Sequence, residues 1–191
     1  MARPTVEPQR RRAMIGAAIE AIHAQGGLDV TVGQIARRAG MSTALAHHYF
    51  GGKDRIFLAA MRQILRDFGA EVVGALRAAH TPRARAEALI SASFAPSCFT
   101  PATISAWMTL YAQATTHPET RRLLTLYQRR LRSNLTHALR PLSPDPTRDA
   151  ETLGALIDGL YLRAALSPGA SVETARATAL RILDILTGGR A

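Results

Sequence analysis

The sequence predicts an all-α protein of nine helices. In every readable segment, apolar residues recur three and four positions apart, which places them on one face of a helix. No run alternates apolar and polar residues in the way that a half-buried strand would. Proline, glycine and capping residues separate the segments, as they do at helix ends.

Length and composition indicate a folded protein. The chain has 191 residues, of which 47% are hydrophobic and 20% charged, a balance typical of globular domains. No apolar run approaches the roughly 18 residues of a membrane span, and the N-terminus lacks the apolar core of a signal peptide. A lone Cys98 excludes an intramolecular disulfide and cannot by itself form a zinc site. We therefore expect a cytoplasmic protein with no membrane partner, no metal and no cofactor.

The net charge of +10 permits binding to nucleic acid without locating it. The basic residues are 23 arginines and a single lysine, a bias typical of a GC-rich genome. Residues 1–55 carry a net charge of +4 and the remainder +6, so the charge is not concentrated in one part of the chain. The net charge alone therefore does not identify the binding partner, and a sequence motif is needed for that.

The first helix is expected over residues 8–25, because Gly26 and Gly27 follow it. Its first turns carry three consecutive arginines, residues 10–12. These side chains either form a solvated face or contact DNA phosphates. Both interpretations remain open at this point.

Residues 31–53 have the pattern of a helix-turn-helix motif. Thr31 and Gln34 predict a capping box, in which each side chain bonds the backbone N–H of the other at the start of the second helix. Ser42 is placed to cap a third helix over residues 42–49. The two helices are therefore expected to meet at a short turn.

Three small residues are expected to set the geometry of this turn. Gly40 permits the left-handed backbone conformation that other residues avoid. Ala36 and Ala46 allow the two helices to approach each other closely. A large side chain at either alanine would push the helices apart.

Such a motif predicts duplex DNA as the partner, because its second helix enters the major groove with its N-terminal residues at the base edges. Here those residues are Thr43, Ala44 and His47. Thr43 can bond a base edge or touch a thymine methyl, and Ala44 leaves room for close approach. A metal site at His47 and His48 is not expected, because neighbouring residues on a helix point about 100° apart. The residues expected near the phosphates of the groove walls are His47, His48, Tyr49 and Lys53.

Residues 8–62 resemble the N-terminal domain of the TetR family of bacterial repressors. The matching features are the Thr31 cap, IARRAG at 35–40, Ser42 with Thr43, and HYFGGKDRIF at 48–57. The chain departs from the family at position 47, where tyrosine is common and this chain has His47.

The resemblance implies a TetR-type fold of two domains. Residues 1–55 would form the DNA-binding domain, and residues 56–191 the ligand-binding and dimerisation domain. The resulting set of predicted DNA-binding residues is Arg11, Thr31, Arg37, Thr43, Ala44, His47, His48, Tyr49 and Lys53.

Six further helices are expected after the motif. The fourth has apolar residues on one side for more than twenty residues, which makes a rod of about 40 Å. Thr100 followed by a proline indicates the cap and first turn of the sixth. The expected spans are 53–79, 83–97, 101–116, a helix from residue 118 onward, 148–167 and 172–187.

Two pairs of residues are candidate ligand contacts. Trp107 and Tyr111 lie four positions apart on the expected sixth helix, and Asp158 and Tyr161 three apart on the eighth. Core packing is the alternative for each aromatic side chain. The carboxylate of Asp158 follows two apolar residues and so needs a partner. The candidate partners are Arg122, Arg163, a helix N-terminus or a bound cation.

Residues 105–114, 129–135 and 156–167 resemble one branch of the TetR family, the choline-sensing repressors of glycine betaine synthesis. A quaternary ammonium group cannot donate a hydrogen bond, so its recognition needs aromatic faces and a carboxylate. The resemblance therefore implies a small-molecule effector, choline, in a pocket between the sixth and eighth helices. The residues of the right types are Trp107, Tyr111, Asp158 and Tyr161.

A single helix-turn-helix buries too little surface for specific DNA binding, so a two-fold dimer on a palindromic operator is expected. The eighth and ninth helices are the candidate interface, and the resemblance implies a four-helix bundle there. Their small and apolar residues are Gly154, Ala155, Gly159, Ala164, Ala165, Ala175, Ala179, Ile182, Leu183 and Leu186.

Three other classes of function compete with a choline-responsive repressor. The first is a TetR-type repressor that responds to a different small molecule, such as a drug, an amphiphile or an aromatic acid. The second is an architectural DNA binder without a sensor domain, which the large apolar C-terminal region disfavours. The third is an enzyme, but the sequence shows no catalytic triad, no phosphate-cradling glycine loop and no reactive carboxylate pair.

Overall fold

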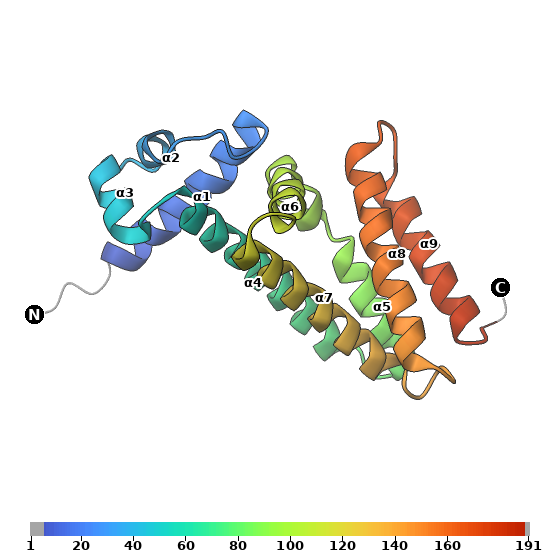
Figure 1. Cartoon of the computed structure of the whole chain (residues 1–191). Coiled ribbons are helices and arrows are strands. Elements are labelled where there is room, and N and C mark those ends of the chain that lie inside the picture. The colour runs from blue at the N-terminus through green and yellow to red at the C-terminus, as the bar shows by residue number, and fades with distance from the viewer. Residues whose placement is uncertain (1–5, 190–191) are drawn as a thin grey trace, which may run out of the picture. The chain divides into compact units, whose positions relative to one another are not determined.

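The computed structural model describes residues 6–189, and this part of the chain is built of nine α-helices and one short 3-10 helix, without a β-strand (Figure 1). The all-α prediction is confirmed. None of the described helices is long and apolar enough to cross a membrane. The elements are α1 (Val6–Gln25), α2 (Val32–Arg38), α3 (Thr43–Phe50), α4 (Lys53–Ala78), α5 (Pro82–Ser93), η1 (Pro96–Phe99), α6 (Pro101–Ala114), α7 (Pro118–Leu139), α8 (Pro146–Leu166) and α9 (Val172–Leu186).

Prolines explain two of the helix boundaries that differ from the sequence-based expectation. Helix α5 ends at Ser93 and not near residue 97, because Pro96 lacks the N–H that would continue it and instead opens η1. Helix α8 begins at Pro146 and not at residue 148, with Asp145 as its N-cap. Proline is favoured at a first helical position, where its missing N–H costs nothing.

The chain forms two compact units. Unit 1 contains residues 1–66 and 100–124, and unit 2 contains residues 67–99 and 125–191. Helices α4 and α7 therefore each contribute one part to each unit. Helix α6 groups with the helix-turn-helix in unit 1, whereas the expected division at residue 55 placed it in the second domain; that division remains a prediction.

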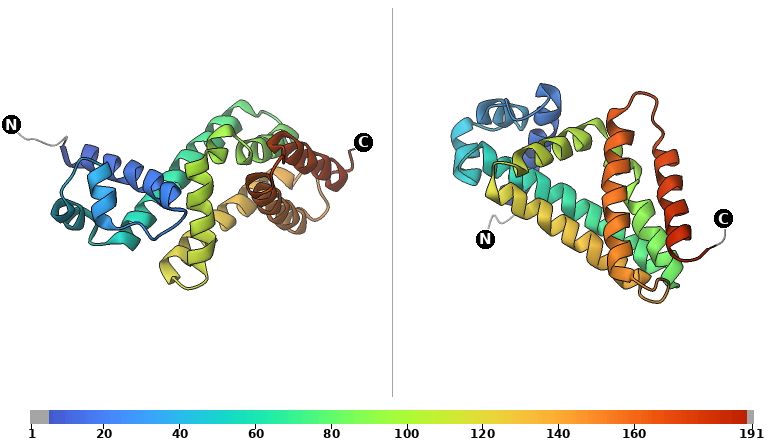
Figure 2. Two further views of the ribbon diagram at one scale, coloured as in Figure 1. Left: turned by 90° about the horizontal axis from the view of Figure 1, so that it is seen from above. Right: turned by 45° about the vertical axis from the view of Figure 1, so that its right-hand side comes forward.

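Unit 1 is organised by α1, which packs against both α2 and α6, while α2 packs against α3 (Figures 1 and 2). Local capping holds the ends of the two short helices. The capping box of Thr31 and Gln34 is present, and the Ser42 hydroxyl oxygen accepts a hydrogen bond from the backbone N–H of Leu45. The largest fully buried side chains of this unit are Met14, Ile22, Ile35, Ile56, Met61 and Leu110.

Unit 2 is a helical bundle in which α8 and α9 lie side by side in opposite directions and α5 packs against both (Figures 1 and 2). Leucine, isoleucine and alanine side chains fill its centre, so burial of apolar surface is the main source of its stability. The core side chains include Leu89, Ile90, Leu131, Leu135, Leu139, Leu153, Ile157, Ala179 and Leu183.

One part of the predicted dimer interface is wrong. Ala175, Ala179 and Leu183 lie at successive turns of α9 and face the core of unit 2, where they are 7%, 0% and 0% exposed. A residue that fills the core of its own chain cannot contact a second copy. The exposed face of α8 instead carries Ala155 and Gly159.

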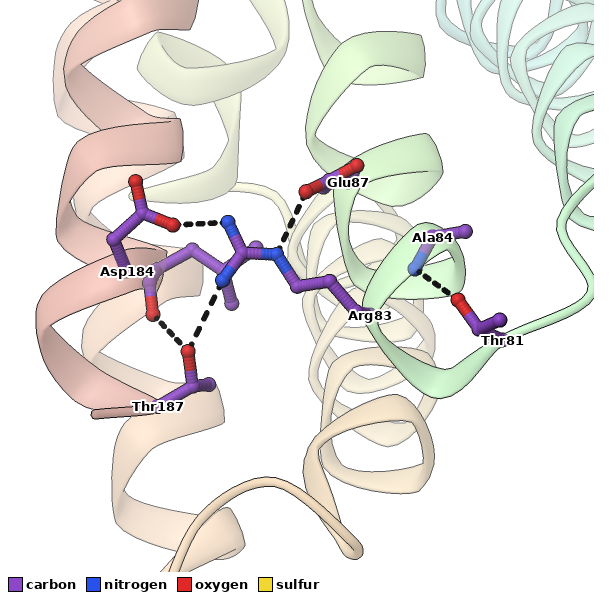
Figure 3. Close-up of polar contacts among 7 residues, drawn as sticks. Thr81, Arg83, Ala84, Glu87, Asp184 and Thr187 are labelled. Atoms are coloured by element: carbon purple, nitrogen blue, oxygen red, sulfur yellow. Dashed lines mark hydrogen bonds and ion pairs between the residues drawn. The ribbon is translucent and has the colours of Figure 1, made fainter. Parts of the chain in front are cut away.

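A polar cluster around Arg83 joins α5 to α9 within unit 2 (Figure 3). The Arg83 guanidinium donates to Glu87 on its own helix at 2.6 Å, and to the Thr187 hydroxyl just after α9 at 3.2 Å. It also donates to the Asp184 carboxylate on α9. One planar fork thereby bonds three acceptors on two helices, which is a geometry that lysine cannot reproduce.

Replacing Arg83 by methionine is expected to lower the free energy of unfolding by about 1 kcal/mol, since the side chain remains partly exposed and its ion pairs are screened. Urea unfolding followed by circular dichroism measures this. Arg176→Met is the control, because that arginine pairs with Glu173 within α9 alone and its loss should leave stability unchanged. Equal unfolding midpoints for the two variants would contradict the assigned role of Arg83.

Candidate DNA-binding and effector sites

The turn between α2 and α3 has the geometry that the sequence predicted. Gly40 adopts a φ of +66°, in the left-handed region. Ala36 and Ala46 are both 0% exposed, so there is no room for larger side chains where the helices meet. At Gly33, an added Cβ would lie 3.4 Å from the Thr43 hydroxyl oxygen, which shows how closely α2 approaches the start of α3.

Most of the predicted DNA-binding residues lie at the surface of α2 and α3. Exposure is what a contact to bases or phosphates requires, and it also shows that these side chains are not needed for the core. Tyr49 is half-buried at the end of α3. The exposed members of the set on the two helices are Arg37, Thr43, Ala44, His47 and His48.

Besides Arg11, three predicted DNA-binding side chains also bond the protein itself. The Thr31 hydroxyl oxygen accepts the α2 cap bond at 3.2 Å, and His47 Nδ1 lies 3.4 Å from the carbonyl oxygen of Gly51. Lys53 Nζ donates to the carbonyl oxygen of Leu28 at 2.5 Å, which ties the start of α4 to the loop after α1. An ammonium group has three donors, so Lys53 retains capacity for a phosphate. Their DNA contacts remain predictions.

Arg11 contacts α3, which the sequence did not predict. Its guanidinium carbon lies 5.3 Å from the centre of the Tyr49 ring and 5.4 Å from that of Phe50, within the range of cation–π attraction. Its Nε donates to Glu7 Oε1 at 3.0 Å, one turn back on α1. The guanidinium is thus held against the last turn of the helix expected to enter the groove.

Trp107 and Tyr111 belong to unit 1 and lie on one face of α6, as their spacing predicted. Their ring centres are 5.9 Å apart and their planes are inclined by 33°. Trp107 is buried and Tyr111 half-buried. Asp158 and Tyr161 belong to unit 2, so each pair is defined within its own unit, and the prediction that all four contact one ligand is untested.

Asp158 is a half-buried carboxylate on α8 whose hydrogen-bond donors are neutral. The Tyr127 hydroxyl on α7 donates to Asp158 Oδ1 at 3.1 Å. Burial raises the pKa of Asp158, and hydrogen bonds from Tyr127 and Gln128 offset only part of that effect. The suggested partner Arg163 is instead exposed. Tyr127 was missed because it lies on another helix, 31 positions away in the sequence.

Tyr161 anchors η1 to α8. Its hydroxyl donates to the carbonyl oxygen of Cys98 at 2.9 Å, and its ring lies 4.9 Å from that of Phe99. On α4, Phe68 contacts the Tyr127 ring edge-on at 6.1 Å. A phenylalanine ring therefore packs against each tyrosine, Phe68 against Tyr127 and Phe99 against Tyr161. Sequence spacing could not identify either phenylalanine.

A groove of about 480 Å³ lies between α7 and α8, and Asp158 is part of its wall. It contains no aromatic side chain and two arginines, so its lining does not match a cage for a cation. The residues that line it are Thr125, Gln128, Arg129, Leu131, Arg132, Ala150, Glu151, Gly154, Ala155 and Asp158. The aromatic side chain that contacts Asp158 is instead Tyr127, on α7.

A helix-turn-helix with an exposed second helix, followed in the same chain by a helical bundle, defines a DNA-binding transcriptional regulator. Comparison with known families agrees. Residues 15–60 match the family of bacterial regulatory proteins called tetR, and residues 82–188 match the C-terminal domain of BetI-type transcriptional repressors. The chain belongs to the TetR family and has a BetI-type C-terminal domain; it is a transcriptional repressor and not an enzyme.

Curated relatives support this assignment over nearly the whole chain. The HTH-type transcriptional regulator BetI of Brucella anthropi is 52% identical over 167 residues, which cover 86% of each protein. The regulator of the same name from Rhizobium meliloti is 49% identical over 163 residues, covering 84% of this chain and 80% of the relative.

Solved structures confirm the fold. A transcriptional regulator from Pseudomonas aeruginosa PAO1 superposes with a TM-score of 0.86 at 26% identity, covering 97% of this chain and 94% of that chain. A regulator from Saccharomonospora viridis, solved in complex with choline, gives a TM-score of 0.84 at 24% identity and covers 93% and 97%. Both have the helical architecture described above.

Asp158→Asn is expected to raise the stability of the protein at neutral pH. The folded state raises the pKa of this carboxyl, so keeping it ionised costs stability above the raised value. The gain in the variant should shrink as the pH falls through that value, and vanish below the ordinary aspartate pKa of about 3.9. Thermal unfolding from pH 7 to pH 3.5 tests this.

The control for this measurement is Glu151→Gln, which removes an exposed carboxylate from the same helix. It should leave thermal stability unchanged at neutral pH. An Asp158→Asn variant less stable than the native chain at pH 7 would contradict the argument.

Proposed function

We propose that the chain represses transcription as a cytoplasmic homodimer on a palindromic operator, that choline is its effector, and that the genes it controls direct glycine betaine synthesis. The observation that carries the effector assignment is Asp158. A half-buried carboxylate with neutral donors, one of them the Tyr127 hydroxyl, offers the negative charge and an aromatic neighbour that a small quaternary ammonium ion needs. It lies in a domain of the BetI type.

The DNA-binding part of the proposal rests on α3. Thr43 and Ala44 are exposed in its first turn, where residues of a recognition helix reach base edges. His47 follows one turn later on the same helix. The side chains proposed to contact phosphates are Thr31, Arg37, His48, Tyr49 and Lys53, because phosphate contacts position the helix in the groove.

The effector part rests on charge balance around Asp158. Hydrogen bonds from neutral donors offset only part of the free-energy cost of partly burying an ionised carboxylate. A bound cation would remove the rest of that cost. Each desolvated cation–π contact adds about 2 kcal/mol. Tyr127 bonds Asp158 directly. Tyr161 on α8 and the α6 residues Trp107 and Tyr111 remain proposed ligand residues. The choline-bound regulator from Saccharomonospora viridis has the same fold.

Choline would act by shifting the population of conformations. A ligand moves an equilibrium only if it binds one form better than the other. A coupling free energy of about 1–3 kcal/mol would change the operator affinity roughly 5- to 150-fold. Dimeric regulators of this class must hold their recognition helices about 34–36 Å apart to read successive major grooves, so a change in that spacing suffices to weaken binding.

Choline is expected to weaken binding of the chain to DNA from upstream of its own gene, measured by gel shift against equal concentrations of sodium chloride. Asp158→Asn should reduce choline affinity at least about tenfold by calorimetry, since it removes a charged acceptor. Glu151→Gln is the matched control, because this exposed carboxylate lines the groove and pairs with Arg132.

A wild-type operator titration that choline leaves unmoved would reject choline as the effector. Thermal shifts with betaine aldehyde, hydrophobic amphiphiles and aromatic acids then identify the alternative ligand class. If Asp158→Asn binds choline as tightly as the native chain, the carboxylate has no role in recognition.

The proposed dimer uses the exposed faces of α8 and α9. Leu166 at the end of α8 is 60% exposed and Ile185 on α9 is 63% exposed, although both are large apolar residues. Ala155 and Gly159 lie on the exposed face of α8 and permit close approach of another helix. A second copy related by a two-fold axis would cover these residues and form a four-helix bundle.

Ile185→Glu is expected to convert the dimer to a monomer at micromolar concentration and to lower operator affinity at least about tenfold, because it places a charge in an apolar interface. Light scattering after size exclusion measures the mass. Val73→Glu is the control: this residue on α4 is also exposed, at 48%, and lies outside α8 and α9. A monomeric native chain, or an unaffected Ile185→Glu dimer, would exclude this interface.

A further inference from the structure

Helix α1 contacts two functionally distinct helices within unit 1. Near its start, the Arg11 guanidinium lies over the Tyr49 and Phe50 rings of α3. Near its end, His23 Nδ1 lies within hydrogen-bond distance of the Ser105 hydroxyl of α6, at 3.0 Å. His23 lies twelve positions after Arg11, so the two are separated by about 18 Å along the helix axis. One element therefore contacts both α6 and the recognition helix.

The Arg11 contact is suited to fixing the orientation of α3. Its two rings belong to consecutive residues in the last turn of α3, and Phe50 is buried while Tyr49 is half-buried. The ion pair with Glu7 restricts the guanidinium further. A cation–π contact of this kind is worth about 0.5–2 kcal/mol. An arginine held in this way acts on DNA binding through the recognition helix and does not need a phosphate of its own.

The other end of α1 is a packed helix pair. Helix α6 packs directly against α1, and small buried side chains lie on both, with Ala21 5% exposed on α1 and Ala106 1% exposed on α6. The His23–Ser105 hydrogen bond sets the register of the two helices. Because α6 groups with the helix-turn-helix in one compact unit, a displacement of α6 acts on α1 directly.

We propose that α1 couples α6 to the recognition helix: the His23–Ser105 bond links α6 to α1, and Arg11 is a positioning residue that links α1 to α3. Shifting or rotating α6 then changes the orientation of α3 through a single rigid helix. The effector-dependent part rests on the proposed function, because α6 carries the proposed ligand residues Trp107 and Tyr111. The link between α6 and operator affinity does not require any effector.

Salt dependence separates a positioning arginine from one that contacts phosphate. Arg11→Met should weaken operator binding about 2- to 30-fold, which is the change in affinity that corresponds to the free energy of the cation–π contact. The slope of log K against log salt concentration should stay at the native value. Removing a phosphate contact instead lowers that slope by about 0.9 for each half-site. Arg37→Met, at an exposed arginine of α2, is the charge-matched comparison. A slope reduced by about 1.8 for the Arg11→Met dimer would overturn its positioning role.

The α6 end is tested with the ligand-free protein. Ser105→Ala and His23→Ala should each change operator affinity about 2- to 10-fold, as expected from one hydrogen bond, and the double variant should match the single variants. Gln113→Ala, two turns further along α6, should leave affinity unchanged. His23 is exposed and Ser105 is half-buried, and circular dichroism checks that both single variants fold.

Three outcomes decide the proposal. Native affinity in Ser105→Ala, or additive losses in the double variant, would overturn it. If the native chain responds to choline, His23→Ala should also reduce the ratio of operator affinities without and with choline, whereas an undiminished ratio would overturn the coupling through α1. A native chain that ignores choline rejects the proposed effector alone, because the ligand-free measurements still decide the role of α1.

Discussion

The close contact between α2 and α3 is the constraint on which the DNA-binding unit depends. Both helices bring an alanine with no exposed surface to their crossing, and the connecting turn requires the positive φ of Gly40. Overpacking such a site costs about 1–3 kcal/mol and shifts the backbone. Small side chains on the inner face of α3 set its position. Its exposed outer face carries Thr43, Ala44 and His47, the proposed base contacts.

The two units differ in how their polar groups are compensated. The DNA-binding unit pairs them through local caps such as that of Ser42 and through longer-range bonds such as that of Lys53 to the Leu28 carbonyl. Unit 2 instead keeps Asp158 half-buried with only neutral donors, so its raised pKa records a cost that the fold has not removed. A complete set of partners favours one rigid arrangement, whereas the under-compensated charge of Asp158 is the feature on which the proposed cation site rests.

Local sequence signals predicted much of this structure, whereas contacts between residues far apart in the sequence could not be predicted. The Thr31 capping box, the Gly40 turn and the proline that opens α6 depend on residues within a few positions, and all three are present. Tyr127 bonds Asp158 across 31 positions, and Arg83 bonds Asp184 across 101. Such pairs follow from how helices pack. Pro96, by contrast, gave a local signal that α5 had to end earlier than its apolar spacing suggested.

The position of Cys98 makes the only thiol of the chain an internal probe of η1. The side chain is 9% exposed, and burial, with a smaller effect from the charge of Glu71, raises its pKa to about 11. Alkylating reagents react with thiolates, so folded Cys98 is doubly protected at neutral pH. Its own carbonyl accepts the Tyr161 hydroxyl. A motion that parts η1 from α8 breaks this bond at the residue that carries the thiol, so the rate of thiol alkylation is expected to report how often unit 2 opens at that point.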